Sequence, residues 1–163
     1  MKIQFTLAAL FAAMLVSAPL GAQEPVVAAS DVEALFHAKD KKLDRNKQAA
    51  YHIEKDLLEA NHWNEADKWL TERYIQHNPN AKSGRAGVVA FFSSRKPTPV
   101  PEHLGIKVTF VNAEGDYVTV GTVREVTDPK TNDKYTTTWF DTWRFVDGKA
   151  DEHWDCATKG GRP

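Results

Sequence analysis

The chain has 163 residues, 26% of them charged, a formal net charge of −1 and a single cysteine. This length and apolar content suit one globular domain, and the near-neutral charge gives no electrostatic reason to expect nucleic acid or an anionic membrane as a partner. One cysteine excludes an internal disulfide, so a hydrophobic core must stabilise the fold.

The first residues have the pattern of a secretory signal peptide. Lys2 precedes an apolar run from Phe5 to Val16, and Ala22 suits the position before a signal-peptidase cut. The run is too short for a comfortable membrane span. We therefore expect residues 1–22 to be cleaved, the mature protein to be periplasmic or secreted, and no membrane contact after cleavage. An uncleaved anchor is the alternative.

The next segment, residues 23–44, mixes small, charged and apolar residues without a clean period. It predicts a flexible segment with at most a short helix near Val32–Ala38. From Asn46 onward apolar residues recur at helical spacing with charged residues between them, which predicts an amphipathic helix to about Ala60. Function is not expected in the flexible segment.

Two further helices are predicted before the chain changes character. Asn64 has the properties of an N-cap for a second helix, which ends in the segment YIQHNPN at Tyr74–Asn80, because Asn78-Pro79 disfavours continuation. A third helix opens near Ser83-Gly84 and includes Phe91. The proline-rich loop KPTPVPEHLG ends it.

Beyond this loop the apolar period becomes alternating. Strands are predicted at residues 106–110 and 117–126, followed by a long hairpin at residues 134–155. Helices followed by antiparallel strands predict an α+β domain, over residues 45–158, in which a curved, mostly antiparallel sheet wraps the N-terminal helices. Residues 159–163 are expected to be a disordered tail.

The hairpin places a carboxylate among aromatic residues. One face of its first strand carries Trp139, Asp141, Trp143 and Phe145, since alternate side chains of a strand share a face. An acid in such a setting is costly unless it is paired or used. Asp147-Gly148 then predicts a tight turn into the second strand.

The partners of Asp141 depend on the register of the hairpin. A two-residue turn puts Glu152 and Trp154 on its face, whereas a three-residue loop puts His153 and Asp155 there, because the side-chain period is two. The burial of Trp154 slightly favours the first register. The sequence leaves both open.

The segments YIQHNPN, SGRAGVVAFF, VNAEGDYVTV and FDTWRFVDGKADEHWD, in this order, resemble the SnoaL-like group of the nuclear transport factor 2-like superfamily. The resemblance covers about residues 46–157. It implies a cone-shaped fold with an internal pocket between sheet and helices, and a homodimer formed through the outer face of the sheet. It also favours the second register of the hairpin.

The resemblance implies site residues as well. Cyclases of this superfamily carry an acid on the last strand, and Asp155 matches it. His77 and Asp141 match positions that face the pocket. Many relatives have two histidines where this sequence has Gly121 and Val123.

Members of the superfamily include polyketide cyclases, isomerases, epoxide hydrolases and proteins without a known reaction. We therefore hypothesise an exported, cofactor-free enzyme without a metal site that acts on a small carbonyl compound by aldol (cyclase-type) or isomerase chemistry. Asp155 would be the base, with Asp141, His153 and His77 orienting groups or donating protons.

Four aromatic residues are expected to contact the ligand, which would be a small apolar or carbonyl-containing molecule: Tyr74, Phe91, Trp139 and Trp143. Each functional interpretation has a structural alternative. Asp155 and His153 would otherwise form a solvated strand end, His77 a turn, and the aromatic residues a filled core. The rival function is a non-catalytic module that binds an apolar ligand or serves in dimerisation.

Overall fold

The computed structural model describes residues 24–161. The predicted signal peptide at residues 1–22 lies outside the described residues, so its cleavage stays a prediction that the mass of the mature protein would test. Between residues 24 and 161, no helix combines the length and the apolar character of a membrane span.

The helical elements all lie before the long strands β2–β5. They are α1 (Val32–Leu35), α2 (Lys41–His52), the π-helical η1 (Ile53–Glu59), the 3-10 helix η2 (Trp63–Glu65), α3 (Ala66–Trp69) and α4 (Arg85–Phe92). Asp40 begins α2, because its carboxylate accepts the N–H groups of Lys42 and Leu43, both at 2.9 Å. Together α2 and η1 form the amphipathic helix predicted from Asn46, and α4 is the predicted third helix.

A five-stranded sheet follows the order β1-β5-β4-β3-β2. Its strands are β1 (Leu70–Gln76), β2 (Val108–Glu114), β3 (Tyr117–Thr127), β4 (Lys134–Val146) and β5 (Lys149–Asp155). β1 runs parallel to β5, and the other neighbours are antiparallel. The predicted curved, mostly antiparallel α+β architecture is therefore confirmed, with a sheet that does not close.

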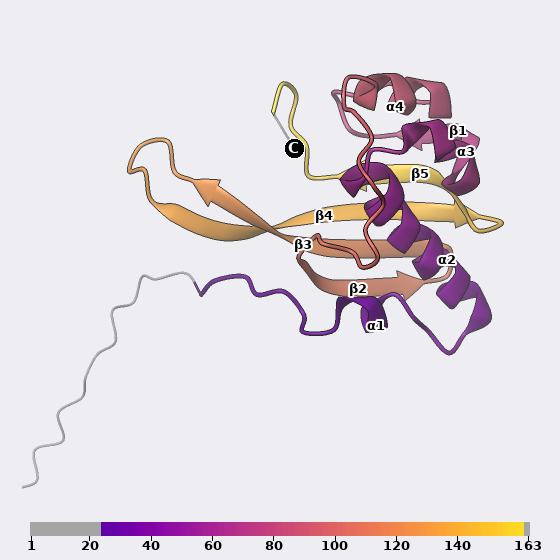
Figure 1. Cartoon of the computed structure of the whole chain (residues 1–163), viewed down its shortest axis with the longest axis horizontal. Helices are drawn as coiled ribbons and strands as arrows, with labels where there is room; N and C mark the ends of the chain where they lie inside the picture. The colour runs from indigo at the N-terminus through magenta and orange to yellow at the C-terminus, as the bar shows by residue number, and fades with distance from the viewer. Residues whose placement is uncertain (1–23, 162–163) are drawn as a thin grey trace, which may run out of the picture.

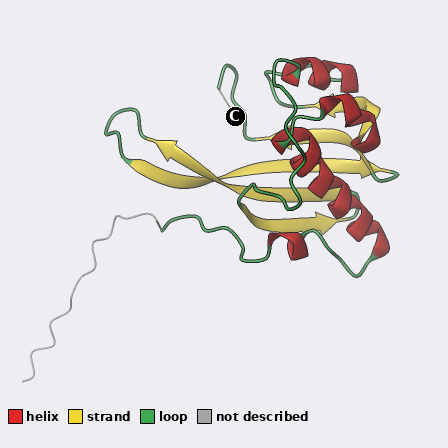
Figure 2. Ribbon diagram, in the orientation of Figure 1, coloured by secondary structure: helices red, strands yellow, loops and turns green. Residues whose placement is uncertain are grey.

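Figures 1 and 2 show the larger helices gathered over one face of the sheet, while the far ends of β3 and β4 extend beyond them as a long hairpin. The core lies between that face and the helices. Leu57, Val88, Val120 and Trp143 are each at most 2% exposed there. Burying side chains of this size contributes on the order of 2 kcal/mol each, so this layer stabilises the fold.

The prediction of a helix across residues 70–76 is wrong. α3 ends at Trp69, and the chain continues as β1, whose residue Gln76 pairs with His153 of β5. The segment LTERYIQ contains Thr, Tyr and Ile, which favour strands, and a short run of this kind is decided by its partners. This change determines which side chains of YIQHNPN face inward.

Part of the segment predicted to be flexible packs against the domain. Phe36 is fully buried in the core, the N–H of Ala29 donates to the carbonyl of Val108 at 2.8 Å, and the N–H of Val26 donates to Thr136 Oγ1 at 2.7 Å. The domain therefore begins before residue 45. At the other end the N–H of Gly160 donates to Asn80 Oδ1 at 2.8 Å, which attaches the start of the predicted tail.

Candidate functional site

The β4–β5 hairpin combines features of both registers that the sequence leaves open. A two-residue turn at Asp147–Gly148 pairs Val146 with Lys149. Both turn residues have positive φ, 49° and 79°, as a type I′ turn requires. With regular pairing beyond this turn, His153 and Asp155 would face away from the helices.

A β-bulge reverses that outcome. The pairing of β4 with β5 is interrupted between Arg144 and Phe145, and Asp151 is the extra residue on β5. One extra residue moves every later side chain of the strand to the opposite face. The register from there places Asp155 opposite Asp141, on the face that the helices cover.

The bulge residue is anchored by its neighbours. The carboxylate of Asp151 accepts hydrogen bonds from the guanidinium of Arg73, from Thr71 Oγ1 at 2.8 Å and from Arg144 Nη2 at 2.5 Å. These bonds, that of Arg73 first, lower the pKa of Asp151 to about 2, so the carboxylate is ionised at neutral pH. The bulge is thereby tied to β1.

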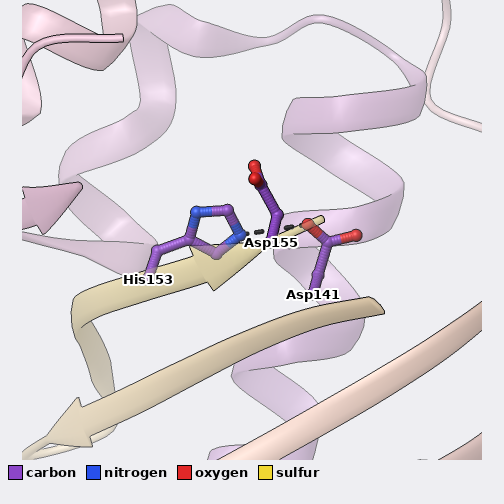
Figure 3. Close-up of side chains that lie close together, drawn as sticks. All are labelled: Asp141, His153 and Asp155. Carbon is purple, nitrogen blue, oxygen red and sulfur yellow. Dashed lines mark hydrogen bonds and ion pairs between the residues drawn. The ribbon is translucent and has the colours of Figure 1, made fainter. Parts of the chain in front are cut away.

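Three ionisable side chains meet on the inner face of this hairpin (Figure 3). Asp141, His153 and Asp155 have nitrogen and oxygen atoms that all lie within 4.8 Å of one another. His153 Nε2 lies 3.0 Å from Asp141 Oδ1, and Nδ1 lies 2.8 Å from Gln76 Oε1. Asp141 is 8% exposed and His153 6%, so this pair is shielded from water.

Asp155 is held by donors on both carboxylate oxygens. Asn78 Nδ2 donates to Oδ2 at 2.7 Å, and the N–H of Ala157 donates to Oδ1 at 2.8 Å. An ionised carboxylate only accepts hydrogen bonds, and these two neighbours match that form. Asp155 is only partly buried, unlike Asp141 and His153.

A cavity of about 230 Å³ opens onto these side chains. Its wall is largely apolar and includes Ile53, Trp63, Leu70, Phe91, Trp139 and Trp143. Five polar residues of the lining lie against one another, Gln76, Asn78, Asp141, His153 and Asp155, and Arg95 lines the cavity as well. An apolar cavity with a few convergent polar groups is the usual form of a small-molecule site.

Tyr74 adds a hydroxyl group to the wall. Its oxygen accepts a hydrogen bond from Trp143 Nε1 at 3.2 Å, and among residues 24–161 no acceptor for its own hydrogen is present. Burial raises the pKa of Tyr74, so the hydroxyl keeps its proton. It can therefore donate to an oxygen atom of a ligand.

Most of the predicted site residues line this cavity. The structure brings together Asp141, His153, Asp155, Tyr74, Phe91, Trp139 and Trp143. Their placement agrees with the prediction, and the catalytic and ligand-binding roles assigned to them stay predictions.

The expected position of His77 is wrong. Its side chain is on the opposite face of the sheet, where Nε2 lies 2.9 Å from Glu152 Oε1 and the ring stacks on Trp154 at 4.9 Å between centroids. The reason is β1, since neighbouring residues of a strand point to opposite faces. His77 is not part of the cavity wall.

The same alternation brings in two residues that the sequence interpretation missed. Gln76 and Asn78 flank His77, line the cavity, and hydrogen-bond to His153 and Asp155. Predicting a strand instead of a helix across the segment YIQ would have pointed to them, because alternate side chains of a strand share a face. The positions of the two missing histidines, Gly121 and Val123, do not line the cavity, so their replacement removes nothing from its wall.

The donor set of Asp141, His153 and Asp155 is of a type that divalent metal ions use. In this structure, however, both nitrogens of His153 already lie against acceptors, Gln76 and Asp141. The arrangement is that of a hydrogen-bonded acid–base cluster. The absence of a metal site stays a prediction, tested with a chelator below.

Comparisons with known proteins place this geometry in a family. A family model described as "SnoaL-like domain" matches residues 51–153, more than half of the chain. No curated protein matches the sequence. Among solved structures, the chain is similar to a proposed polyketide cyclase from Bacillus cereus ATCC 10987, with 20% identity, a TM-score of 0.50, and coverage of 81% of this chain and 84% of that one.

A second similar structure is a proposed SnoaL-like polyketide cyclase from Jannaschia sp. CCS1. It has 15% identity and a TM-score of 0.50, and the match covers 74% of this chain and 91% of that one. At these identities the likeness shows a shared fold. Because the family model matches residues 51–153, more than half of the chain, the chain belongs to the SnoaL-like domain family.

Proposed function

We propose that this protein is an acid–base enzyme that removes a proton from the carbon next to a carbonyl group of a small apolar compound, as aldol cyclases and isomerases do. One observation carries the proposal: the Asp155 carboxylate lies beside the shielded Asp141–His153 pair at the wall of a largely apolar cavity. A base and a separate proton donor facing one cavity are what such a reaction needs.

The chemistry requires only these side chains. Asp155 takes the proton, and the electrons of the broken C–H bond form an enolate whose oxygen is protonated by the Asp141–His153 pair or stabilised by the Tyr74 hydroxyl. In an aldol closure the enol carbon then attacks a second carbonyl carbon and forms a C–C bond. The proton on Asp155 passes to the new hydroxyl, and the enol proton returns to the Asp141–His153 pair. In an isomerisation, Asp155 returns its proton to a different carbon.

The direct test is hydrogen exchange on a simple ketone. 2-Tetralone, a small aromatic ketone, is incubated with the purified protein in D2O, and loss of its protons next to the carbonyl is followed by NMR. We expect exchange above the buffer rate, reduced by about 10²-fold or more in Asp155→Asn, because a positioned base contributes roughly that factor. Asp133→Asn, an acid exposed in the β3–β4 loop, is the matched control and should leave the rate unchanged.

Two outcomes would count against the proposal. If the ketone shifts resonances of cavity residues without any exchange above background, the protein is a binding module of this fold. If a chelator abolishes the exchange, a metal ion supplies the chemistry and the purely acid–base account is wrong.

A further inference from the structure

The amide of Gln76 has a fixed orientation. The backbone N–H of Asn78 donates to Gln76 Oε1 at 2.9 Å, and a backbone N–H can only donate. The oxygen, and not the NH₂ group, must therefore occupy this position, although the two ends of an amide are normally hard to tell apart. The same oxygen lies 2.8 Å from His153 Nδ1.

This contact determines where His153 carries its hydrogen. An amide oxygen only accepts, so Nδ1 must donate and must be protonated. The rings of Trp143 and Tyr74 stack with the imidazole at centroid distances of 5.2 and 6.3 Å, which holds its plane. Nε2 then faces Asp141 Oδ1 at 3.0 Å, and one proton is shared between these two atoms.

The side-chain amide of Asn78, two residues after Gln76, is oriented in the same way by a backbone N–H group. The N–H of Asn80 donates to Asn78 Oδ1 at 2.9 Å, which leaves the Nδ2 group of Asn78 facing Asp155 Oδ2 at 2.7 Å. The turn that follows β1 therefore uses backbone N–H groups to orient two amides. One amide presents an acceptor to His153 and the other presents a donor to Asp155.

We propose that Gln76 is a positioning residue that keeps the proton on Nδ1 of His153, so that the proton between His153 Nε2 and Asp141 is the one that the site transfers. The inference rests on the proposed function and assigns its proton donor more closely. His153 has no free N–H for a substrate, since both nitrogens are engaged. The proton delivered to a carbonyl oxygen is therefore the one shared between His153 Nε2 and Asp141 Oδ1, and the enol returns it to the same pair when the new bond forms.

The test is the tautomer of His153, read from the ¹⁵N resonances of its two ring nitrogens in the labelled protein without any ligand. In the wild type we expect Nδ1 to have the resonance of a protonated nitrogen at every pH at which the fold persists. In Gln76→Leu the acceptor is gone, so at high pH Nδ1 should lose its proton and the Nε2–H tautomer should appear. Gln76→Glu restores an acceptor oxygen and should restore protonated Nδ1.

The neighbouring variant His77→Leu is the matched control, because His77 directly follows Gln76 at the end of β1 and its side chain faces outward. It should leave the His153 resonances unchanged. A wild-type protein with bare Nδ1, or a folded Gln76→Leu variant with the wild-type tautomer, would overturn the proposal. Because no substrate is involved, this result is independent of the ketone experiment. If the ketone shows no exchange but Nδ1 of His153 is protonated as expected, only the proposed function is wrong.

Discussion

Glu54 is a carboxyl group in the interior with no compensation for its charge. Its side chain belongs to η1, the residue is 2% exposed, and Oε1 has no hydrogen-bond partner in the described structure. Burial first, and then the negative charges of Asp141 and Glu59, raise the pKa of Glu54 well above its usual value. The residue is therefore protonated in the folded protein at pH values at which the unfolded chain is ionised.

A pH dependence of stability follows from Glu54. Because its pKa is raised in the folded state, the native protein binds more protons, and the free energy of unfolding falls as pH rises above the unfolded value of 4.5. Glu54→Gln removes this loss. Urea denaturation at several pH values measures the free energy of unfolding. Relative to the wild type, that of the variant should rise by up to about 1.4 kcal/mol per pH unit until the pKa of Glu54 in the folded protein is reached.

The control for Glu54 is Glu72→Gln, an exposed glutamate of β1. Its stability curve should run parallel to that of the wild type. Parallel curves for Glu54→Gln as well would mean that Glu54 ionises freely in the folded state, which requires water at its carboxyl group.

At the scale of elements, the β4–β5 hairpin depends on the geometry of its turn. Gly148 has a φ of 79°, and a Cβ added there would lie 3.1 Å from Arg45 Cδ. Gly115, in the β2–β3 turn, has a φ of 59° with nothing within 4 Å of such a Cβ. Both glycines thus have a positive φ, but only at Gly148 would an added Cβ lie close to another side chain.

Alanine at these two positions separates the two effects. Gly115→Ala should lower the free energy of unfolding by about 1 kcal/mol, from backbone strain alone. Gly148→Ala should cost more, because the Arg45 side chain must also move. Chemical denaturation measures both, and equal losses would show that Arg45 accommodates the methyl group freely.

The sequence predicted the elements whose pattern is long and strongly periodic. α2 with η1, α4 and the strands β3, β4 and β5 lie where alternation or helical spacing places them. β1 was missed because seven residues fit either period, and its parallel pairing with β5 is a contact that no local pattern contains. The cavity position expected for His77 came from the resemblance, and the structure instead places this side chain against Glu152 and Trp154 on the outer face.

The site was predictable in its residue types but not in its assembly. Asp141 among aromatic residues pointed to the inner face of β4, as observed. His153 and Asp155 reach that face only because the two-residue turn is followed by the bulge at Asp151. That bulge is held by Arg73 of β1, a residue far away in the sequence, so the register is a tertiary property.

At the scale of the whole molecule, the outer face of the sheet has exposed aromatic side chains through which two copies of the protein could associate. This face carries Tyr117, 46% exposed, and Phe140, 40% exposed. Trp154 lies beside Tyr117, with ring centroids 6.1 Å apart, and Phe110 lies beside Phe140 at 6.0 Å. Aromatic side chains are enriched where protein surfaces associate, and a two-fold dimer would bury the same patch on both copies.

We therefore expect a homodimer formed through the outer face of the sheet. Replacing Tyr117 and Phe140 together by lysine puts positive charge on both copies of the patch, which should repel across a two-fold axis and convert the dimer to a monomer. Light scattering after size exclusion measures the mass directly. Val27→Lys, which changes an exposed apolar residue of the N-terminal segment, should leave the mass unchanged.

A wild-type protein that is monomeric at micromolar concentration would show that this face does not join two copies. A dimer that survives the double substitution would place the interface on another surface of the fold.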